Sequence, residues 1–388
     1  MALPHNSAVA QTVRTVSAVN GIQAAIAASS PGDILVLGGG TYDPFVLDRG
    51  LVIRGNGATI GGGPGASLSA VTVAVPPGQI AHLDNLRFTY GYSPFGSLGC
   101  PVTVSGAVRI DRCTMVTRNG SPALAANSAQ LTIVASSLTC GGTTGSGIAL
   151  QATDSHIELR DSTVTGSPAG CHPVGCMVWS FPATPAAQLD QSSLHAERSR
   201  FDGGSQPSTT FRSDGASGIE ATNSALWLAD CVVTGGSSAA GNGATALQNT
   251  GSITAELRQT QLVAGSPGGQ PSSGPLDPSA PLLLLELQPV WTRGQNSTLT
   301  MRGTPGNLFG LFLTPSIDSV STAGIVEPVL ATGAVALAVG TLDGSGNATV
   351  VLPVPAVTSL LHTPVWCQAA SGIGLPLRAS TMAGGLVR

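Results

Sequence analysis

Six charged side chains between residues 158 and 198 are of the types that acid–base chemistry requires. They lie on two similar segments, IELRDSTVTG at 157–166 and LHAERSRFDGG at 194–204. Carboxylates beside a histidine and arginines are the groups that cleave a glycosidic bond or remove a proton from a uronate. If the chain is an enzyme, its candidate catalytic residues are Glu158, Arg160, Asp161, His195, Glu197 and Arg198.

The order of these charges also has a purely structural explanation. When the two segments are aligned, Arg160 lies beside Glu197, and Glu158 lies beside His195. Pairing of opposite charges on neighbouring strands would produce the same alternation. We therefore favour an exposed salt-bridge lattice, and whether the chain is an enzyme stays open.

Aromatic side chains are scarce, at 4% of the residues, but they gather in two segments, TYGYSPFGSLGC at 89–100 and MVWSFP at 177–182. Rings in protruding loops suit sugar binding, because a pyranose offers an apolar face for stacking. Packing of the rings onto the body of the protein is the simpler interpretation. The candidate ligand-binding residues are Tyr90, Tyr92, Phe95, Trp179 and Phe181.

The seven cysteines suggest disulfides more than a metal site. Cys171 and Cys176 are the first and last residues of the short segment CHPVGC, where two thiols and one histidine fall short of four zinc ligands. In an exported protein a disulfide closing this loop is the better interpretation. Cys100 and Cys140 flank corners on the same side of the fold described next and are a second candidate pair. We expect neither a metal nor a cofactor.

A repeated pattern must position all of these groups. Its template is apolar-x-apolar-x-x-small-x-apolar, as in LTIVASSLTCG at 131–141 and LWLADCVVTGG at 226–236. Alternation with a period of two on both sides of a bend predicts two short strands that meet at a corner, and a third strand precedes each pair. The central apolar positions are Leu83, Ile110, Ile133, Leu159, Ala196, Leu228 and Leu257.

One such coil cannot bury its apolar side chains alone, so the coils must stack into three parallel sheets around a continuous core. The small residues at the bend, among them Cys113, Ser136 and Ser162, should then form a ladder inside the stack. Ahead of the first strands, GIQAAIAASSPGD predicts a short amphipathic helix that caps the first coil, with Asn20 as its N-cap.

The run GIQAAIAASSPGDILVLGGGTYDPFVLDRGLVIRGNGATI resembles the first coils of right-handed parallel β-helix proteins of the pectate-lyase-like superfamily. The resemblance covers roughly residues 11–265 and implies the fold, not the activity. That superfamily includes lyases, hydrolases, esterases, tailspikes, adhesins and surface proteins. The catalytic motifs of its polygalacturonases, pectate lyases and pectin methylesterases have no match in this sequence.

The remaining segments complete the expected organisation. Residues 266–281 have the composition of a linker, and 282–388 contain strand-like pieces typical of a β-sandwich. The segment GTLDGSGNATVVLPVPAVTSLLHTPVWCQAA is similar to one found in exported proteins of planctomycetes. Residues 1–10 end in Ala-Val-Ala and are interpreted as the remnant of a secretory signal. The predicted location is extracellular or at the cell surface.

Charge limits the range of functions. Only 9% of residues are charged, the net charge is −4 and all 16 basic residues are arginine, so we expect no nucleic acid partner. No apolar run is long enough for a membrane span. A weakly charged surface suits packing against copies of itself, as a homo-oligomer or polymer. The favoured function is an exported non-catalytic scaffold, and the alternatives are a polysaccharide lyase or hydrolase and a carbohydrate-binding adhesin.

Overall fold

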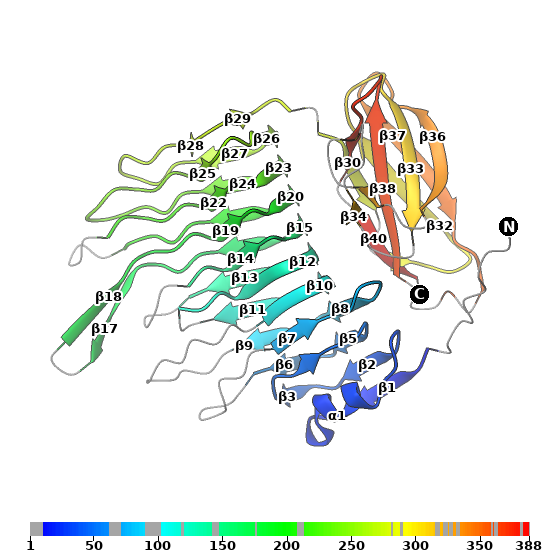
Figure 1. The fold of residues 1–388 in the computed structure, drawn as a ribbon, viewed down its shortest axis with the longest axis horizontal. Helices are drawn as coiled ribbons and strands as arrows, with labels where there is room; N and C mark the ends of the chain where they lie inside the picture. Colours follow the sequence, from blue (N-terminus) through cyan, green and yellow to red (C-terminus); the bar gives the residue numbers. More distant parts are fainter. Residues whose placement is uncertain are drawn as a thin grey trace.

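The structure is a column of stacked coils with a smaller sandwich beside it (Figure 1). It is a computed structural model. The residues that it describes are 11–61, 71–89, 102–117, 120–141, 147–174, 177–207, 213–280, 282–287, 290–314, 319–320, 325, 329–330, 334–357, 360, 364–380 and 383–387.

One strand from each coil lies on the first face of the column. Neighbouring strands on this face pair in parallel, as the repeat predicts. The strands are β1 (Val13–Val16), β2 (Ile34–Leu37), β5 (Val52–Gly55), β8 (Ile80–Asp84), the second halves of β10 (Val102–Asp111) and β12 (Leu124–Val134), β15 (His156–Arg160), β20 (Ser193–Glu197), β23 (Ala225–Ala229), β26 (Ala255–Arg258) and β29 (Leu276–Asp277).

The other two faces are also parallel sheets, which confirms the predicted three-sheet parallel β-helix. The second face holds β4 (Val46–Leu47), β7 (Val71–Ala74), the first halves of β10 and β12, β14 (Leu150–Thr153), β19 (Ala187–Asp190), β22 (Ile219–Thr222), β25 (Leu247–Thr250) and β28 (Ser272–Ser273). The third holds β3 (Gly40–Tyr42), β6 (Ala58–Ile60), β9 (Arg87–Thr89), β11 (Thr114–Thr117), β13 (Ser137–Cys140), β16 (Thr163–Thr165), β21 (Arg200–Asp202), β24 (Val232–Thr234) and β27 (Gln261–Val263).

The small residues at the bends form the predicted ladder. The backbone N–H of Ser136 donates to Ser162 Oγ at 3.1 Å, and that of Ser162 donates to Ser199 Oγ at 3.2 Å. Each serine thereby satisfies a backbone donor that the bend removes from the sheet. A second ladder that the sequence analysis missed runs at the corner between the second and first faces, from Ser155 to Ser192 at 3.1 Å.

The residue before each ladder position has a left-handed backbone. At the corner between the first and third faces, the residues with positive φ are Asn85, Arg112, Ala135, Asp161, Arg198, Asp230 and Gln259. Ala135, at φ 48°, has no polar side chain to compensate for the strain.

We expect Ala135→Gly to raise the free energy of unfolding by about 0.5–1 kcal/mol, measured by urea denaturation. The matched change Ala126→Gly, in the extended part of β12, should lower it, and loss of stability in both variants would contradict the explanation.

The short helix α1 (Ile22–Ala27) lies between β1 and β2 in the chain, after the 3-10 turn η1 (Ala18–Asn20). Ile22 and Ile26 are buried in the core of the column, as the amphipathic pattern predicts. The N-cap expectation was wrong, because Gly21 holds that position and no side chain caps the helix. That the helix caps the first coil stays a prediction.

The segment predicted to be a linker, 266–281, instead continues the column. Its strands β28 and β29 pair with β25 and β26. Composition misled the prediction because prolines are typical of linkers, but their carbonyls can still bond to a neighbouring coil. The carbonyls of Pro271 and Pro275 accept hydrogen bonds from Leu247 and Ala255 of the preceding coil, at 3.2 and 3.1 Å, and a proline can accept as well as any residue.

The described residues from 282 onward form the predicted sandwich. One sheet consists of β30 (Leu284–Leu287), β32 (Asn296–Arg302) and β37 (Asn347–Pro353). The other contains β31 (Val290–Trp291), β40 (Ala383–Val387), β38 (Pro364–Gly372), β33 (Leu308–Thr314) and β36 (Val335–Thr341), with β39 (Arg378–Ala379) beside β38. Short strands β34 (Ser319–Val320) and β35 (Val329–Leu330) pair separately, and the hairpin of β17 (Gly170–Val174) and β18 (Met177–Phe181) leaves the column (Figure 1).

Candidate functional site

The first face, where the candidate catalytic residues lie, is covered by the sandwich. Side chains that should point outward there, such as Glu158, His195 and Trp227, are buried. Trp227 packs in one apolar cluster with Leu282 and Leu284 of the sandwich side. The prediction of an exposed lattice was therefore wrong about exposure, because a repeat pattern identifies an outward side chain but does not show which domain packs on it.

An ion pair between adjacent coils lies at the centre of this interface. Arg160 Nη2 is 2.6 Å from Glu197 Oε2, as the charge alternation predicts, and Arg160 also donates to the carbonyl of Leu285 at 2.6 Å. The Glu197 side chain has no exposed surface. Its burial raises the pKa of the carboxyl, while the charges of Arg160 and Arg198 oppose that rise.

The neighbouring charges are also held in pairs. Arg198 binds Asp161 through two hydrogen bonds of 2.8 and 3.0 Å and reaches Glu286 of the sandwich at 3.3 Å. Glu158 is in register with His195, as predicted, and its Oε1 also lies 3.5 Å from His156 Nε2. The arrangement brings all six candidate residues together and directs several of them at the sandwich.

A second charged cluster lies on earlier coils of the same face, and the sequence analysis did not identify it. Asp111 contacts Arg109 at 2.7 Å and His82 at 2.8 Å, while Asp84 contacts Arg54 at 3.0 Å. Burial opposes ionisation of Asp111, but the positive charges beside it outweigh burial and hold the pKa of its carboxyl well below the usual range. The signal was present, because these residues occupy the same repeat positions as Glu158 and Arg160.

Arginines connect the column to the sandwich along this face. Arg258 donates to the carbonyl of Leu282 at 2.6 Å, and the Arg109 guanidinium lies 4.7 Å from the ring centroid of Trp366. Arg378 of the sandwich forms an ion pair with Glu256 of β26. Charged side chains of this face therefore bind groups of the sandwich. A polymer could reach them only if the sandwich moved away.

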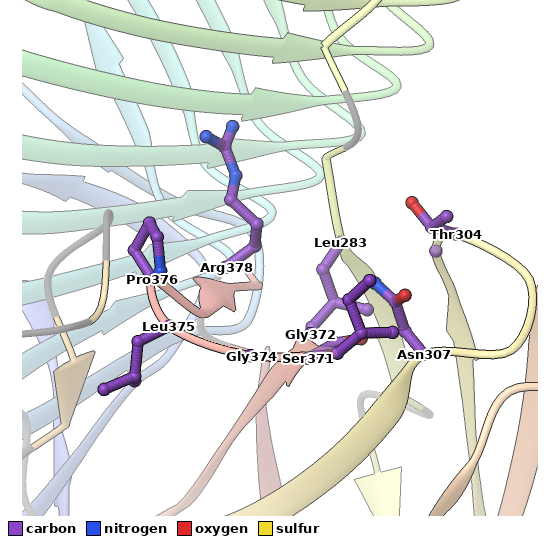
Figure 2. A pocket seen from close by; sticks show the side chains of 11 residues that line it. Leu283, Thr304, Asn307, Ser371, Gly372, Gly374, Leu375, Pro376 and Arg378 are labelled. Atoms are coloured by element: carbon purple, nitrogen blue, oxygen red, sulfur yellow. The ribbon is translucent and has the colours of Figure 1, made fainter.

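A cavity of about 270 Å³ opens at the rim of the interface (Figure 2). Figure 2 shows Arg378 extending toward the strands of the column, with Thr304 and Asn307 across the cavity from it. Apolar side chains, including Leu283 and Leu375, form much of the remaining lining. The cavity holds none of the six candidate catalytic residues.

The other predicted site residues are only partly described. Tyr90, Tyr92, Phe95, Cys100 and Cys176 lie outside the described residues. Cys171 and Trp179 lie on β17 and β18, in register with Ser180 and His172, and Phe181 is half-buried at the end of β18. The Cys140 thiol is buried and contacts the Ser121 carbonyl at 3.6 Å. Both disulfides and the sugar contacts stay predictions.

Comparison with known proteins assigns no family. No family model matches the chain, and no curated protein matches it. A solved structure that matches in part is a superoxide reductase (neelaredoxin) from Ignicoccus hospitalis, with 11% sequence identity and a TM-score of 0.19, covering 28% of this chain and 80% of that chain. Similarity this low supports no argument about function.

The described residues contain no group of three or more His, Cys, Asp or Glu side chains placed to hold a metal ion. Within the same residues, no helix is long and apolar enough to cross a bilayer.

His195 should make the stability of the protein depend on pH. Burial, followed by the positive charges of His156, Arg160 and Arg378, lowers its pKa from 6.5 to about 3. Below pH 6.5 the unfolded chain therefore binds a proton that the folded chain does not, and stability falls as the pH falls. Between pH 7 and pH 5 the loss due to His195 should be about 2 kcal/mol.

The variant His195→Gln separates this contribution from those of the other titrating groups. Urea denaturation at pH 7 and pH 5 should show a drop in the free energy of unfolding that is smaller in the variant by about 2 kcal/mol. Equal drops in the two proteins would mean that His195 is protonated in the folded state.

Proposed function

We propose that this protein is a non-catalytic scaffold, exported to the cell surface or the extracellular space. The observation that carries the proposal is the cover over the first face. An enzyme that acts on an extended polymer needs an open face, whereas the charges here bond to one another and to the sandwich. In this proposal the paired buried charges hold the sandwich against the column.

The location and the family rest on sequence resemblance. The coils resemble those of the pectate-lyase-like superfamily, and the sandwich resembles segments of exported planctomycete proteins. That superfamily includes surface proteins and adhesins as well as enzymes, which fits a column whose charged face is closed. The proposal extends these resemblances to the function of the whole chain.

A panel of soluble polysaccharides tests the scaffold against the enzyme. The intact protein should release neither unsaturated nor reducing sugars, and Glu158→Gln should not differ from it. Circular dichroism before and after incubation shows that both proteins stay folded. Release by the intact protein that Glu158→Gln abolishes would overturn the scaffold and support a lyase or hydrolase.

A carbohydrate-binding adhesin is the second candidate, and the β17–β18 hairpin favours it. The hairpin projects from the longest coil, away from the sandwich (Figure 1). It carries Trp179 and Phe181, two of the candidate sugar-stacking residues. Glycan-array binding that Trp179→Ala abolishes and His172→Ala, its cross-strand neighbour, retains would support this function. If the wild-type protein binds no glycan on the array, the adhesin function is excluded.

A further inference from the structure

Strands β36 and β37 are edge strands, one in each sheet of the sandwich. Within the described residues, β36 pairs only with β33, and β37 pairs only with β32. Figure 1 shows β36 on the side of the sandwich away from the column. Each strand therefore presents backbone N–H and C=O groups along its free side.

Neither strand carries a charge. Their sequences are VALAVGT and NATVVLP, and the exposed side chains include Val335 at 59%, Val339 at 78% and Val351 at 55%. Proteins usually protect a free edge with charged residues, proline or a covering segment, because an unprotected one pairs with another strand. The last coil of the column follows that rule with Pro271 and Pro275, whereas β36 contains neither a proline nor a charge.

The strand β36 is complementary to itself. Antiparallel pairing with β36 of another molecule, centred on Ala338, would place Val335 opposite Thr341 and Leu337 opposite Val339. Small and apolar side chains would then meet, and no like charges would face one another. Such a contact has two-fold symmetry and closes on itself, so it gives a dimer rather than an open fibre.

The same sheet already provides an interface elsewhere. Trp366 and Gln368 of β38 are buried on the outer side of the sheet, where Trp366 packs over Arg109 of the column. Phe312 of β33 is the register neighbour of Gln368 on one side and of Ala336 on the other. The apolar edge at β36 is thus continuous with a surface that is used for docking within the chain.

We propose that two copies of this protein associate through β36, joining their six-stranded sheets into one continuous sheet, with exposed side chains of β36 and β37 packed at the contact. The inference rests on the scaffold function for its biological use, since it names the surface through which scaffold molecules associate. The dimer itself requires no sugar, metal or other ligand.

Sedimentation equilibrium of the full chain over a range of concentrations tests the dimer. The wild-type mass should rise to that of two chains, and Val339→Arg should raise the dimer dissociation constant by about 100-fold, because each dimer would bury two unpaired charges. Val19→Arg makes the same change at a valine that is 94% exposed on the column, and it should dimerise like the wild type.

Hydrogen exchange identifies the surface independently. The amides of 335–341 should exchange more slowly as the wild-type concentration rises, and those of Val339→Arg should not change. A single-chain mass at every concentration would overturn the proposal, as would dimers or larger assemblies that persist in Val339→Arg. These outcomes leave the scaffold function itself intact, whereas polysaccharide cleavage would overturn the scaffold and leave the dimer standing.

Discussion

Replacing Arg160 with methionine should lower the free energy of unfolding by about 3–5 kcal/mol. The change removes the guanidinium that lies 2.6 Å from the fully buried Glu197 carboxyl and leaves Arg198, at 3.9 Å, in contact with it. The Leu285 carbonyl also loses the hydrogen bond from Arg160. A fully buried carboxylate that loses its closest ionic contact is costly, because the 3.9 Å contact with Arg198 compensates its charge less well. Urea denaturation at pH 7, followed by tryptophan fluorescence, measures the loss.

The pair formed by Arg200 and Asp202 is a matched control. Its Nε–Oδ2 distance is also 2.6 Å, but the Arg200 side chain is 53% exposed. Water screens this pair, so Arg200→Met should cost less than about 1 kcal/mol. If the two arginine variants lose the same stability, the sandwich does not bury the Arg160 pair, and the closed face that supports the scaffold function disappears with it.

Truncating Phe201 to alanine should also lower the free energy of unfolding by about 3–5 kcal/mol. Phe201 points into the column from β21 and is fully buried. It is in register with Val164 of the preceding coil and Val233 of the next, so its loss leaves a cavity that two neighbouring coils must share. Thermal and urea unfolding would both show the effect.

Val116→Ala tests whether the loss of stability depends on a side chain of the third face pointing into the column. Val116 lies on β11 of that face, but it is half-buried and alternates with the buried Met115. Its truncation should cost less than about 1 kcal/mol, because the side chain leaves no enclosed cavity. A loss as large as that of Phe201→Ala would contradict the assignment of inward and outward positions.

The sequence alone was sufficient for the column because its signal is local and repeated. The alternation around Leu159 and Ala196, with a small residue three positions later, has one solution in which every apolar side chain is buried. Register followed from the same pattern, since a slip by one residue would turn the whole apolar set outward. The pairing of Arg160 with Glu197 was predictable for this reason.

The docking of the sandwich was decided only by the tertiary structure. Nothing local distinguishes the outward charges of β15 and β20 from charges on a solvated face, because the contacts that bury them come from Leu285 and Glu286, far along the chain. The last coil was hidden for a related reason, since the composition of 266–281 is that of a linker, and only the pairing of β28 and β29 with β25 and β26 shows that the segment belongs to the column. Periodicity in a sequence records which side of a strand faces the core, whereas the partner of the opposite side is set by surfaces that meet only after folding.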